Sequence, residues 1–353
     1  MCRSSCNTRG SGPRFVKTLL ECPTGCHAKL ICMIIVTGAN GFIGSALIWQ
    51  LNQRGYSHIL AVDSVGLDQR NLLQGKAYSQ FLLKDQLWEF LRSPKAYEVT
   101  GIFHMGACSA TTEKNWEFLK ENNLEYSQKI FQWAAKEQKT LIYASSAATY
   151  GDGNMGFDDQ SPSTNFEPLN LYGKSKLLMD QWALEQKEVP HHWYGVRFFN
   201  VFGPNEYHKD SMSSVDYKSF HQIKKNRKLG LFKSYHPDYQ DGEQKRDFVY
   251  VKDVIHWMVD LMENTPQNGI YNMGSGKARS WMDLAKAVFK SMNQDLNIDW
   301  LEMPAELKNQ YQYFTEAKMQ KWYGQNLDES EWPLEKAVED YVQNYLQKGD
   351  SLL

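Results

Sequence analysis

The sequence has few cysteines outside one short region, almost no net charge and no long apolar run. Five of its six cysteines lie within the first 32 residues, which leaves Cys108 for the rest of the chain. This distribution excludes a secreted protein that is cross-linked by a framework of disulfide bonds. The net charge of −2 provides no basic field for nucleic acid, and no apolar segment approaches the length of a membrane span. We therefore expect a cytoplasmic protein with no nucleic-acid or membrane partner.

Residues 1–32 are expected to be an extension outside the fold, with Met33 as the natural start of the protein. Two cysteine pairs in this region raise a zinc site as an alternative, but each pair has three intervening residues and nothing else there resembles a metal knuckle. A weak transit-peptide character, from several basic residues and one acid, is a second alternative. We expect no metal.

The stretch from Met33 to Asp63 has the pattern of a strand, a glycine-rich turn, a helix and a second strand. Gly38, Gly41 and Gly44 would let the backbone turn sharply and approach a pyrophosphate, which the free N–H groups of the following helix can bind. Asp63 can accept hydrogen bonds from an adenosine ribose. The pattern predicts an α/β fold with a Rossmann-type, doubly wound parallel sheet, and glycines that serve only as turns are the weaker alternative.

Residues beyond Asp63 extend the predicted cofactor site. Arg70, in a loop, could bind a ribose 2′-phosphate, which would favour NADP, or could be an ordinary surface arginine. A strand over 101–105 ends in small residues that permit close approach of a nicotinamide and its ribose. A helix is predicted over 116–136, and Cys108 is interpreted as a small, buried residue.

A strand over 140–144 ends in serines and is followed by a long loop over 151–168, of the kind that covers a substrate. A helix then begins with Tyr172 and Lys176, which share one helix face. We expect the lysine ammonium and an oxidised nicotinamide to lower the pKa of the phenol. With Ser146 at the same substrate oxygen, these residues form a candidate acid/base set.

Several longer segments carry a resemblance that covers residues 33 to about 346. They are GACSATTE (106–113), YASSAATYG (143–151), RFFNVFGPNEYHKDSMSS (197–214), KRDFVYVKDV (245–254) and YNMGSGKARS (271–280). The chain resembles the extended short-chain dehydrogenase/reductase superfamily, which acts largely on nucleotide sugars. Within it, the HKDSM segment is similar to that of the 6-epimerases of ADP-linked heptoses, which serve lipopolysaccharide core synthesis.

The resemblance implies an isomerase that inverts a secondary alcohol through a transient ketone. One NADP per subunit, with NAD as the other possibility, would stay tightly bound and be regenerated in each turnover. A ketone reduced on either face benefits from two acid/base groups, and the resemblance makes Lys209 the second one beside Tyr172. From the residues alone, a phosphate contact or a surface lysine is the preferred interpretation of Lys209, and the resemblance reverses that preference.

The resemblance also implies two sets of binding residues. The cofactor set is Gly38, Gly41, Phe42, Ile43, Gly44, Asp63, Ser64, Arg70, Met105, Gly106, Ala107, Asn122, Lys176 and Val201. The substrate set is Ser109, Asn200, Ser211, Lys218, Arg246 and Tyr311. Arg246 is independently suited to a diphosphate, or could pair with Asp247. Met105, Lys218 and an apparent insertion over 231–245 depart from the family pattern.

We expect residues 33–199, with parts of 247–275, to form the NAD(P)-binding domain, and 200–246 with 276–346 to form mainly the substrate-binding lobe. The resemblance implies a homo-oligomer, with a pentamer as its size. A related epimerase is the nearest rival, and a dehydratase is disfavoured because Ala147 and Ala148 follow Ser146 where such enzymes place two acids. A catalytically silent nucleotide sensor is the rival from another class.

Overall fold

The computed structural model describes residues 32–304 and 311–353, except for the side chain of Ser211. The predictions about residues 1–31, including the extension and the cysteine pairs, lie outside the described residues. In the part of the chain that is described, no helix is both long and apolar enough to cross a membrane.

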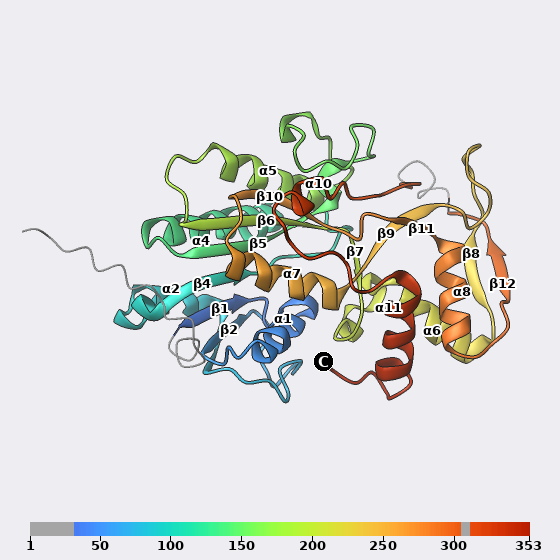
Figure 1. Ribbon diagram of the computed structural model, residues 1–353, viewed down its shortest axis with the longest axis horizontal. Coiled ribbons are helices and arrows are strands. Elements are labelled where there is room, and N and C mark those ends of the chain that lie inside the picture. Colours follow the sequence, from blue (N-terminus) through green and yellow to red (C-terminus); the bar gives the residue numbers. More distant parts are fainter. Residues whose placement is uncertain (1–31, 305–310) are drawn as a thin grey trace, which may run out of the picture.

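A seven-stranded sheet forms the centre of the molecule, and its strand order is β10-β6-β5-β4-β1-β2-β3 (Figure 1). Every neighbouring pair is parallel. The order runs outward in both directions from β1 and β4, which confirms the predicted doubly wound, Rossmann-type sheet. Its strands are β1 (Met33–Thr37), β2 (Ile59–Asp63), β3 (Gln80–Leu83), β4 (Val99–His104), β5 (Thr140–Ser146), β6 (His192–Phe198) and β10 (Gly269–Met273).

Both faces of this sheet are covered, as a parallel sheet requires. In β1, Ile34 and Val36 belong to the apolar core that includes α1 and α7, whereas Met33 and Ile35 belong to the core of the opposite face, with α2, α4 and α5. The alternation explains why the first four residues of β1, 33–36, are all apolar. These helices are α1 (Phe42–Gln53), α2 (Leu87–Arg92), α4 (Tyr126–Lys136), α5 (Leu171–Glu185) and α7 (Val251–Asn264).

The helix predicted over 116–136 is present but not regular. It begins as α3 (Trp116–Leu119), widens into the π-helical segment η3 (Lys120–Glu125) and continues as α4. The buried Asn123 side chain lies in this segment, accepts a hydrogen bond from the Cys108 N–H and donates one to the Cys108 carbonyl. The widened turn therefore joins the helix to the loop that follows β4.

A smaller lobe lies beyond the carboxyl ends of the main strands, at the right of Figure 1. It contains a three-stranded sheet in the order β11-β9-β7 and the parallel pair β12-β8. Its elements are β7 (Asn200–Phe202), α6 (Val215–Asn226), β8 (Leu229–Phe232), β9 (Lys245–Tyr250), β11 (Ala278–Ser280), α8 (Trp281–Ser291), β12 (Ile298–Leu301) and α11 (Leu334–Tyr341). The exact boundaries between the two lobes stay a prediction.

Short helical turns complete the described chain. They are η1 (Lys84–Gln86), η2 (Pro94–Glu98), η4 (Ala147–Tyr150), η5 (Ser163–Asn165), η6 (Tyr207–Met212), α10 (Gln320–Tyr323) and η7 (Val342–Leu346).

Candidate active site

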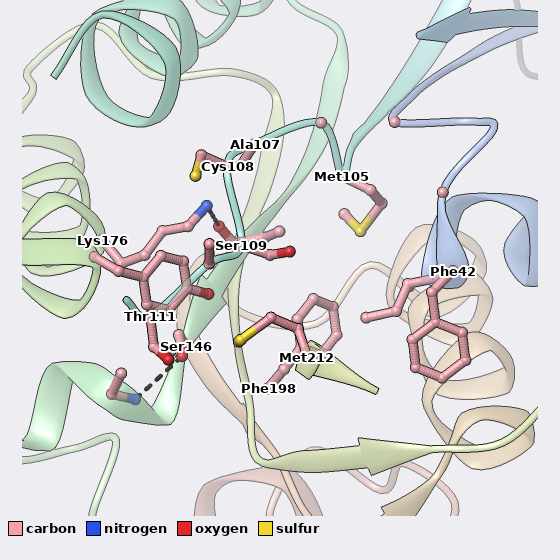
Figure 2. A pocket seen from close by; sticks show the side chains of 18 of the residues that line it. Phe42, Met105, Ala107, Cys108, Ser109, Thr111, Ser146, Lys176, Phe198 and Met212 are labelled. Carbon is pink, nitrogen blue, oxygen red and sulfur yellow. Dashed lines mark hydrogen bonds between the residues drawn. The ribbon is translucent and has the colours of Figure 1, made fainter. Parts of the chain in front are cut away.

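A cavity of about 870 Å³ lies at the carboxyl ends of β1, β2, β4 and β5. The strand order reverses between β1 and β4, and ligands of open α/β sheets bind at such a switch point. Figure 2 shows Ser146 and Lys176 on one side of the cavity and Phe42 on the other. The lining brings together every residue predicted for catalysis (Ser146, Tyr172, Lys176 and Lys209) and every residue predicted for the cofactor (Gly38, Gly41, Phe42, Ile43, Gly44, Asp63, Ser64, Arg70, Met105, Gly106, Ala107, Asn122, Lys176 and Val201).

The glycines at the start of α1 are required by close backbone contacts. A Cβ on Gly38 would lie 2.7 Å from the Gly106 nitrogen, and one on Gly44 would lie 2.0 Å from the Gly38 carbonyl oxygen. No side chain caps the helix at Gly41, its N-cap residue. The first turn of α1 therefore presents backbone N–H groups to the cavity, which fits the pyrophosphate of a dinucleotide.

Asp63 is held rigidly at the end of β2. Its two carboxylate oxygens accept hydrogen bonds from the backbone N–H groups of Asn40 and Val65, each at 2.9 Å. Arg70 lies 3.9 Å from the same carboxylate and donates to the Asn40 carbonyl at 2.7 Å. The acid and the arginine thus stand side by side where the second strand ends, so the structure brings both predicted ribose contacts to one place.

The cavity has an excess of positive charge. Four lysine or arginine side chains line it, and Asp63 is the one acidic residue among the described lining residues. A surface of this kind suits a ligand that carries several phosphate charges. The four basic residues are Arg70, Lys84, Lys176 and Lys209.

Ser146, Tyr172 and Lys176 form one group at the ends of β5 and α5. The Asn170 side chain caps α5 by accepting a hydrogen bond from the Gly173 N–H at 2.8 Å. This cap fixes Tyr172 as the second residue of the helix. Lys176, one turn later, donates to the Ala144 carbonyl at 2.9 Å. The cap and this bond hold the group against the end of β5.

The expected lowering of the phenol pKa by Lys176 is not found among the protein's own groups, and the part expected from an oxidised nicotinamide stays a prediction. Burial raises the pKa of Tyr172, although its hydrogen bond with Ser146 acts in the opposite direction. Burial also lowers the pKa of Lys176 to about 8. Both shifts favour the neutral form of the group, because the low dielectric of the interior penalises charge.

Lys209 reaches the same cavity from η6 in the smaller lobe. Its ammonium lies 5.3 Å from the centre of the Phe42 ring, above the start of α1. Burial lowers the pKa of Lys209, and the negative charge of Glu206 opposes this effect. Two titratable groups from different lobes, Tyr172 and Lys209, therefore face one space.

The predicted substrate residues divide into two groups. Ser109 and Asn200 line the cavity, whereas Lys218, Arg246 and Tyr311 do not, and the Ser211 side chain lies outside the description. The guanidinium of Arg246 lies 5.3 Å from the centre of the Tyr311 ring. The proposed roles of these residues stay predictions.

Arg246 is not paired with Asp247, the alternative considered from the sequence. The Asp247 carboxylate accepts hydrogen bonds from the backbone N–H groups of Ser275, Gly276 and Ala317. Arg246 lies over the Trp281 ring as well as that of Tyr311, and donates to the Lys245 carbonyl at 2.8 Å. The arginine belongs to an aromatic cluster beside the cavity.

Other lining residues were missed from the sequence. Lys84 directly follows β3, as Ser64 follows β2, so the rule that strand ends face the ligand could have identified it. Gln312 and Thr315 come from a segment without regular structure, and no local pattern marks them. Cys108, which was expected to be buried, is partly exposed and lines the cavity.

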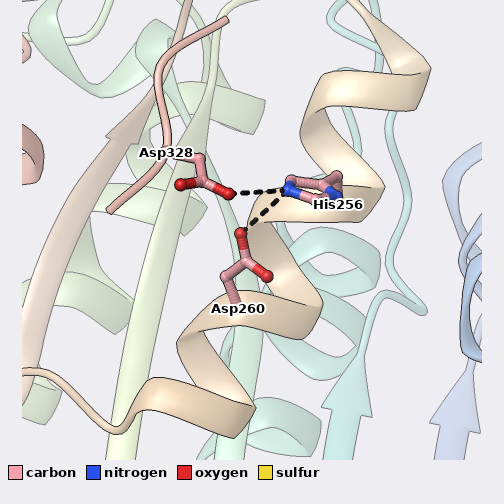
Figure 3. Close-up of side chains that lie close together, drawn as sticks. All are labelled: His256, Asp260 and Asp328. Atoms are coloured by element: carbon pink, nitrogen blue, oxygen red, sulfur yellow. Dashed lines mark hydrogen bonds and ion pairs between the residues drawn. The ribbon is translucent and has the colours of Figure 1, made fainter. Parts of the chain in front are cut away.

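One cluster elsewhere has the residue types of a metal site. His256, Asp260 and Asp328 point their polar atoms toward one another (Figure 3), and one possible ligand atom from each lies within 4.8 Å of the others. Arg54 also takes part in the cluster: its guanidinium lies 2.9 Å from Asp260 and 3.1 Å from the second imidazole nitrogen. Hydrogen bonding to Asp260 raises the pKa of His256 to about 9, so the cluster is an ion-pair network.

The model of the NAD dependent epimerase/dehydratase family matches residues 34–274. The ADP-L-glycero-D-manno-heptose-6-epimerase of Fusobacterium nucleatum is 46% identical over 332 residues, which cover 91% of this chain and 100% of that protein. The protein of the same name from Nitratidesulfovibrio vulgaris strain DP4 is 43% identical, with 91% and 100% covered. The crystal structure of the Helicobacter pylori protein of that name aligns with a TM-score of 0.74 and 26% identity, over 90% of this chain and 97% of that one.

Proposed function

The chain belongs to the NAD dependent epimerase/dehydratase family, and on that premise we propose that it is an isomerase that converts ADP-D-glycero-β-D-manno-heptose into ADP-L-glycero-β-D-manno-heptose. The reaction inverts the alcohol carbon at position 6 of the heptose. Relatives with this name align with the present chain over their whole length. We further propose that the reaction takes place in the cytoplasm and supplies lipopolysaccharide core synthesis.

One observation carries the proposal: Tyr172 and Lys209 come from different lobes and line the same cavity. An epimerase that works through a ketone must remove hydride from one face of the carbon and return it to the other. The substrate oxygen then occupies two positions, and each position needs a group that can exchange its proton. Tyr172 and Lys209 supply one such group each.

When bound, the nicotinamide accepts the hydride from the alcohol carbon and returns it to the ketone. The side chains of the protein accept and return the proton of the substrate hydroxyl group. Burial raises the pKa of the Tyr172 phenol and lowers the pKa of the Lys209 ammonium. These shifts favour the phenol as a proton donor and the amine as a proton acceptor, and two opposite steps require one group of each kind. Ser146 shares a hydrogen bond with the phenol and orients its proton.

The family uses a nicotinamide cofactor, and we propose NADP, tightly bound with one molecule per subunit. The support is Arg70, which lines the cavity beside Asp63. A guanidinium there can bind a 2′-phosphate, while the carboxylate alone would favour the free hydroxyl of NAD. Equilibrium titration of the cofactor-free protein with each dinucleotide measures the preference, and equal affinities would contradict it.

The experiment for the reaction is incubation of the purified protein with ADP-D-glycero-D-manno-heptose. The two epimers should interconvert with no net change in nicotinamide absorbance. Tyr172→Phe and Lys209→Met should each lower kcat by about 10²-fold or more, because each removes a proton-transfer group. Cofactor content after purification should be unchanged in both variants.

Matched controls are Tyr97→Phe and Lys224→Met, which alter exposed residues of the same types and should retain normal kcat. Full activity in Lys209→Met would contradict the two-group assignment. Steady formation of reduced nicotinamide would indicate a dehydrogenase, and loss of water from the sugar a dehydratase. Binding of both ligands without turnover would favour the silent sensor.

A further inference from the structure

Glu206 is a buried carboxylate at the base of the segment that carries Lys209. Its side chain accepts four hydrogen bonds: from the N–H of Gly203 at 3.1 Å, from the N–H and hydroxyl of Ser214 at 2.5 and 2.7 Å, and from the Tyr341 hydroxyl at 3.1 Å. Gly203 and Ser214 lie on either side of η6, and Tyr341 lies on α11. One side chain therefore closes the whole segment into a loop and attaches it to the smaller lobe.

The hydrogen-bond pattern favours the ionised form of Glu206. Backbone N–H groups can only donate, and one approaches each carboxylate oxygen, Gly203 at Oε1 and Ser214 at Oε2. A proton on Oε2 would meet this donor, and one on Oε1 would have to turn the Ser214 or Tyr341 hydroxyl into an acceptor. Burial raises the pKa of Glu206 above its ordinary value, and the bonds from Ser214 and Gly203 and the charge of Lys209 oppose this effect. The side chain is 1% exposed.

Lys209 lies one helical turn beyond this charge. Its backbone N–H donates to the Glu206 carbonyl at 2.9 Å, so the backbone position of the lysine is tied to that of the glutamate. Glu206 is also the group that raises the pKa of Lys209, against the effects of burial and of the Lys218 charge. Of the residues on either side of Lys209 in the chain, Asp210 carries a carboxyl group, whereas burial and the charges of Arg70 and Lys209 lower the pKa of His208 to about 4, so its imidazole carries no charge near neutral pH.

A second buried carboxyl, Asp216 on α6, provides a natural comparison. Burial and the charge of Glu206 raise its pKa well above the usual value, and its Oδ1 atom has no hydrogen-bond partner. The environment of Asp216 therefore disfavours its charged form, and Asp216 is not among the groups that shift the pKa of Lys209. Two neighbouring carboxyls of similar burial differ in how their oxygens are hydrogen-bonded.

We propose that Glu206 is the positioning residue for Lys209: its ionised carboxylate fixes the η6 segment over the cavity and supplies the negative charge that stabilises the protonated amine. The inference rests on the proposed function, which makes Lys209 an acid/base group. It adds a buried residue that lies outside the cavity lining and acts through the lysine.

The test compares Glu206→Gln with Asp216→Asn, which replace the two carboxyls by amides of nearly the same shape. Glu206→Gln should lower kcat by about tenfold or more and change KM for the sugar nucleotide less than threefold. The limb of the pH profile that belongs to Lys209 should move to lower pH by about one unit, because an attractive negative charge is lost. Asp216→Asn should leave the profile in place. Glu206→Asp, which restores the charge on a shorter side chain, should return the limb toward its original pH.

A direct measurement of the amine distinguishes failure of this inference from failure of the proposed function. Competitive acetylation of the holoenzyme at a series of pH values, read by mass spectrometry of the Lys209 peptide, gives the titration midpoint without turnover. The midpoint should fall by about one unit in Glu206→Gln and stay in place in Asp216→Asn. A shifted midpoint in a protein that does not epimerise the heptose would overturn the function and support the positioning role. An unchanged midpoint in an active enzyme, or equal shifts in both variants, would overturn the positioning role. If Glu206→Gln does not fold, Glu206→Asp and Asp216→Asn decide between the same outcomes.

Discussion

Gly44 allows α1 to lie close to the turn after β1. A Cβ at this position would lie 2.0 Å from the Gly38 carbonyl oxygen, which belongs to the backbone and cannot rotate away. We expect Gly44→Ala to destabilise the fold by about 1–3 kcal/mol and to weaken cofactor binding strongly, because α1 must shift from its anion-binding position. Thermal unfolding and titration with the dinucleotide measure the two effects.

The control is Gly101→Ala in β4. The nearest atom to a Cβ there is 3.7 Å away, an ordinary contact. This variant should bind the cofactor normally. Equal loss of binding in both variants would mean that any added methyl group near the sheet is harmful, and that the close approach at Gly44 has no special role.

Individual residues were predictable where a local rule placed them. Asp63 and Ser146 end parallel strands, and such ends meet at one edge of the sheet. The pKa of Tyr172 was not predictable, since spacing shows that Lys176 shares its helix face but says nothing of burial. The ammonium is also directed to the Ala144 carbonyl, which no sequence pattern indicates.

At the scale of elements, His256 joins α7 to the segment that precedes α11. Its Nε2 atom lies 3.1 Å from Asp260 and 3.2 Å from Asp328 (Figure 3). The folded-state pKa of about 9 is above the ordinary value of about 6.5. Stabilisation by the imidazolium is therefore fully present below about pH 6.5 and is lost as the pH rises through about 9.

We expect His256→Gln to cost on the order of 1–2 kcal/mol at pH 6, allowing for partial solvent screening, and much less at pH 10. The measurement is the difference in unfolding free energy between variant and wild type at several pH values. His191→Gln, which alters an exposed histidine, should show no such trend. A difference that is constant with pH would mean that His256 acts through packing alone.

Most elements were predictable from periodicity, including β1, α1, α7 and α8. Their apolar residues repeat at the spacing of one buried face or a fully buried strand. The π-helical segment within 116–136 was not predictable, because it is associated with the hydrogen bonds of the Asn123 side chain to a distant loop. The turn η6 was not predicted for a similar reason, since Glu206 closes it through hydrogen bonds with Ser214 and Tyr341.

For the whole molecule, we expect a chain that begins at Met33 to fold and to retain activity. β1 begins at Met33 and is paired on both sides, with β2 and β4, along its length. Circular dichroism, thermal unfolding and the epimerisation assay compare this shorter chain with the full one. A large loss of stability or turnover would show that the first 32 residues take part.

The assembly state is the coarsest property and stays a proposal. The resemblance implies a homo-oligomer, with a pentamer as its size, and sedimentation velocity of the holoenzyme measures it. A monomer at micromolar concentration would contradict the proposal.

The pairing of β7, β9 and β11 could not be predicted from local sequence patterns, because these strands come from distant parts of the chain and their partners are set by the tertiary fold.

The place of β10 in the main sheet has a consequence for how the protein is made. β6 ends at Phe198, and its outer neighbour β10 begins only at Gly269, after much of the smaller lobe. During synthesis the ribosome must therefore add about 70 residues while the backbone edge of β6 is exposed and able to pair with other chains. Pairing so distant in sequence also slows folding. The newly made chain should consequently depend on chaperones more than its final stability indicates.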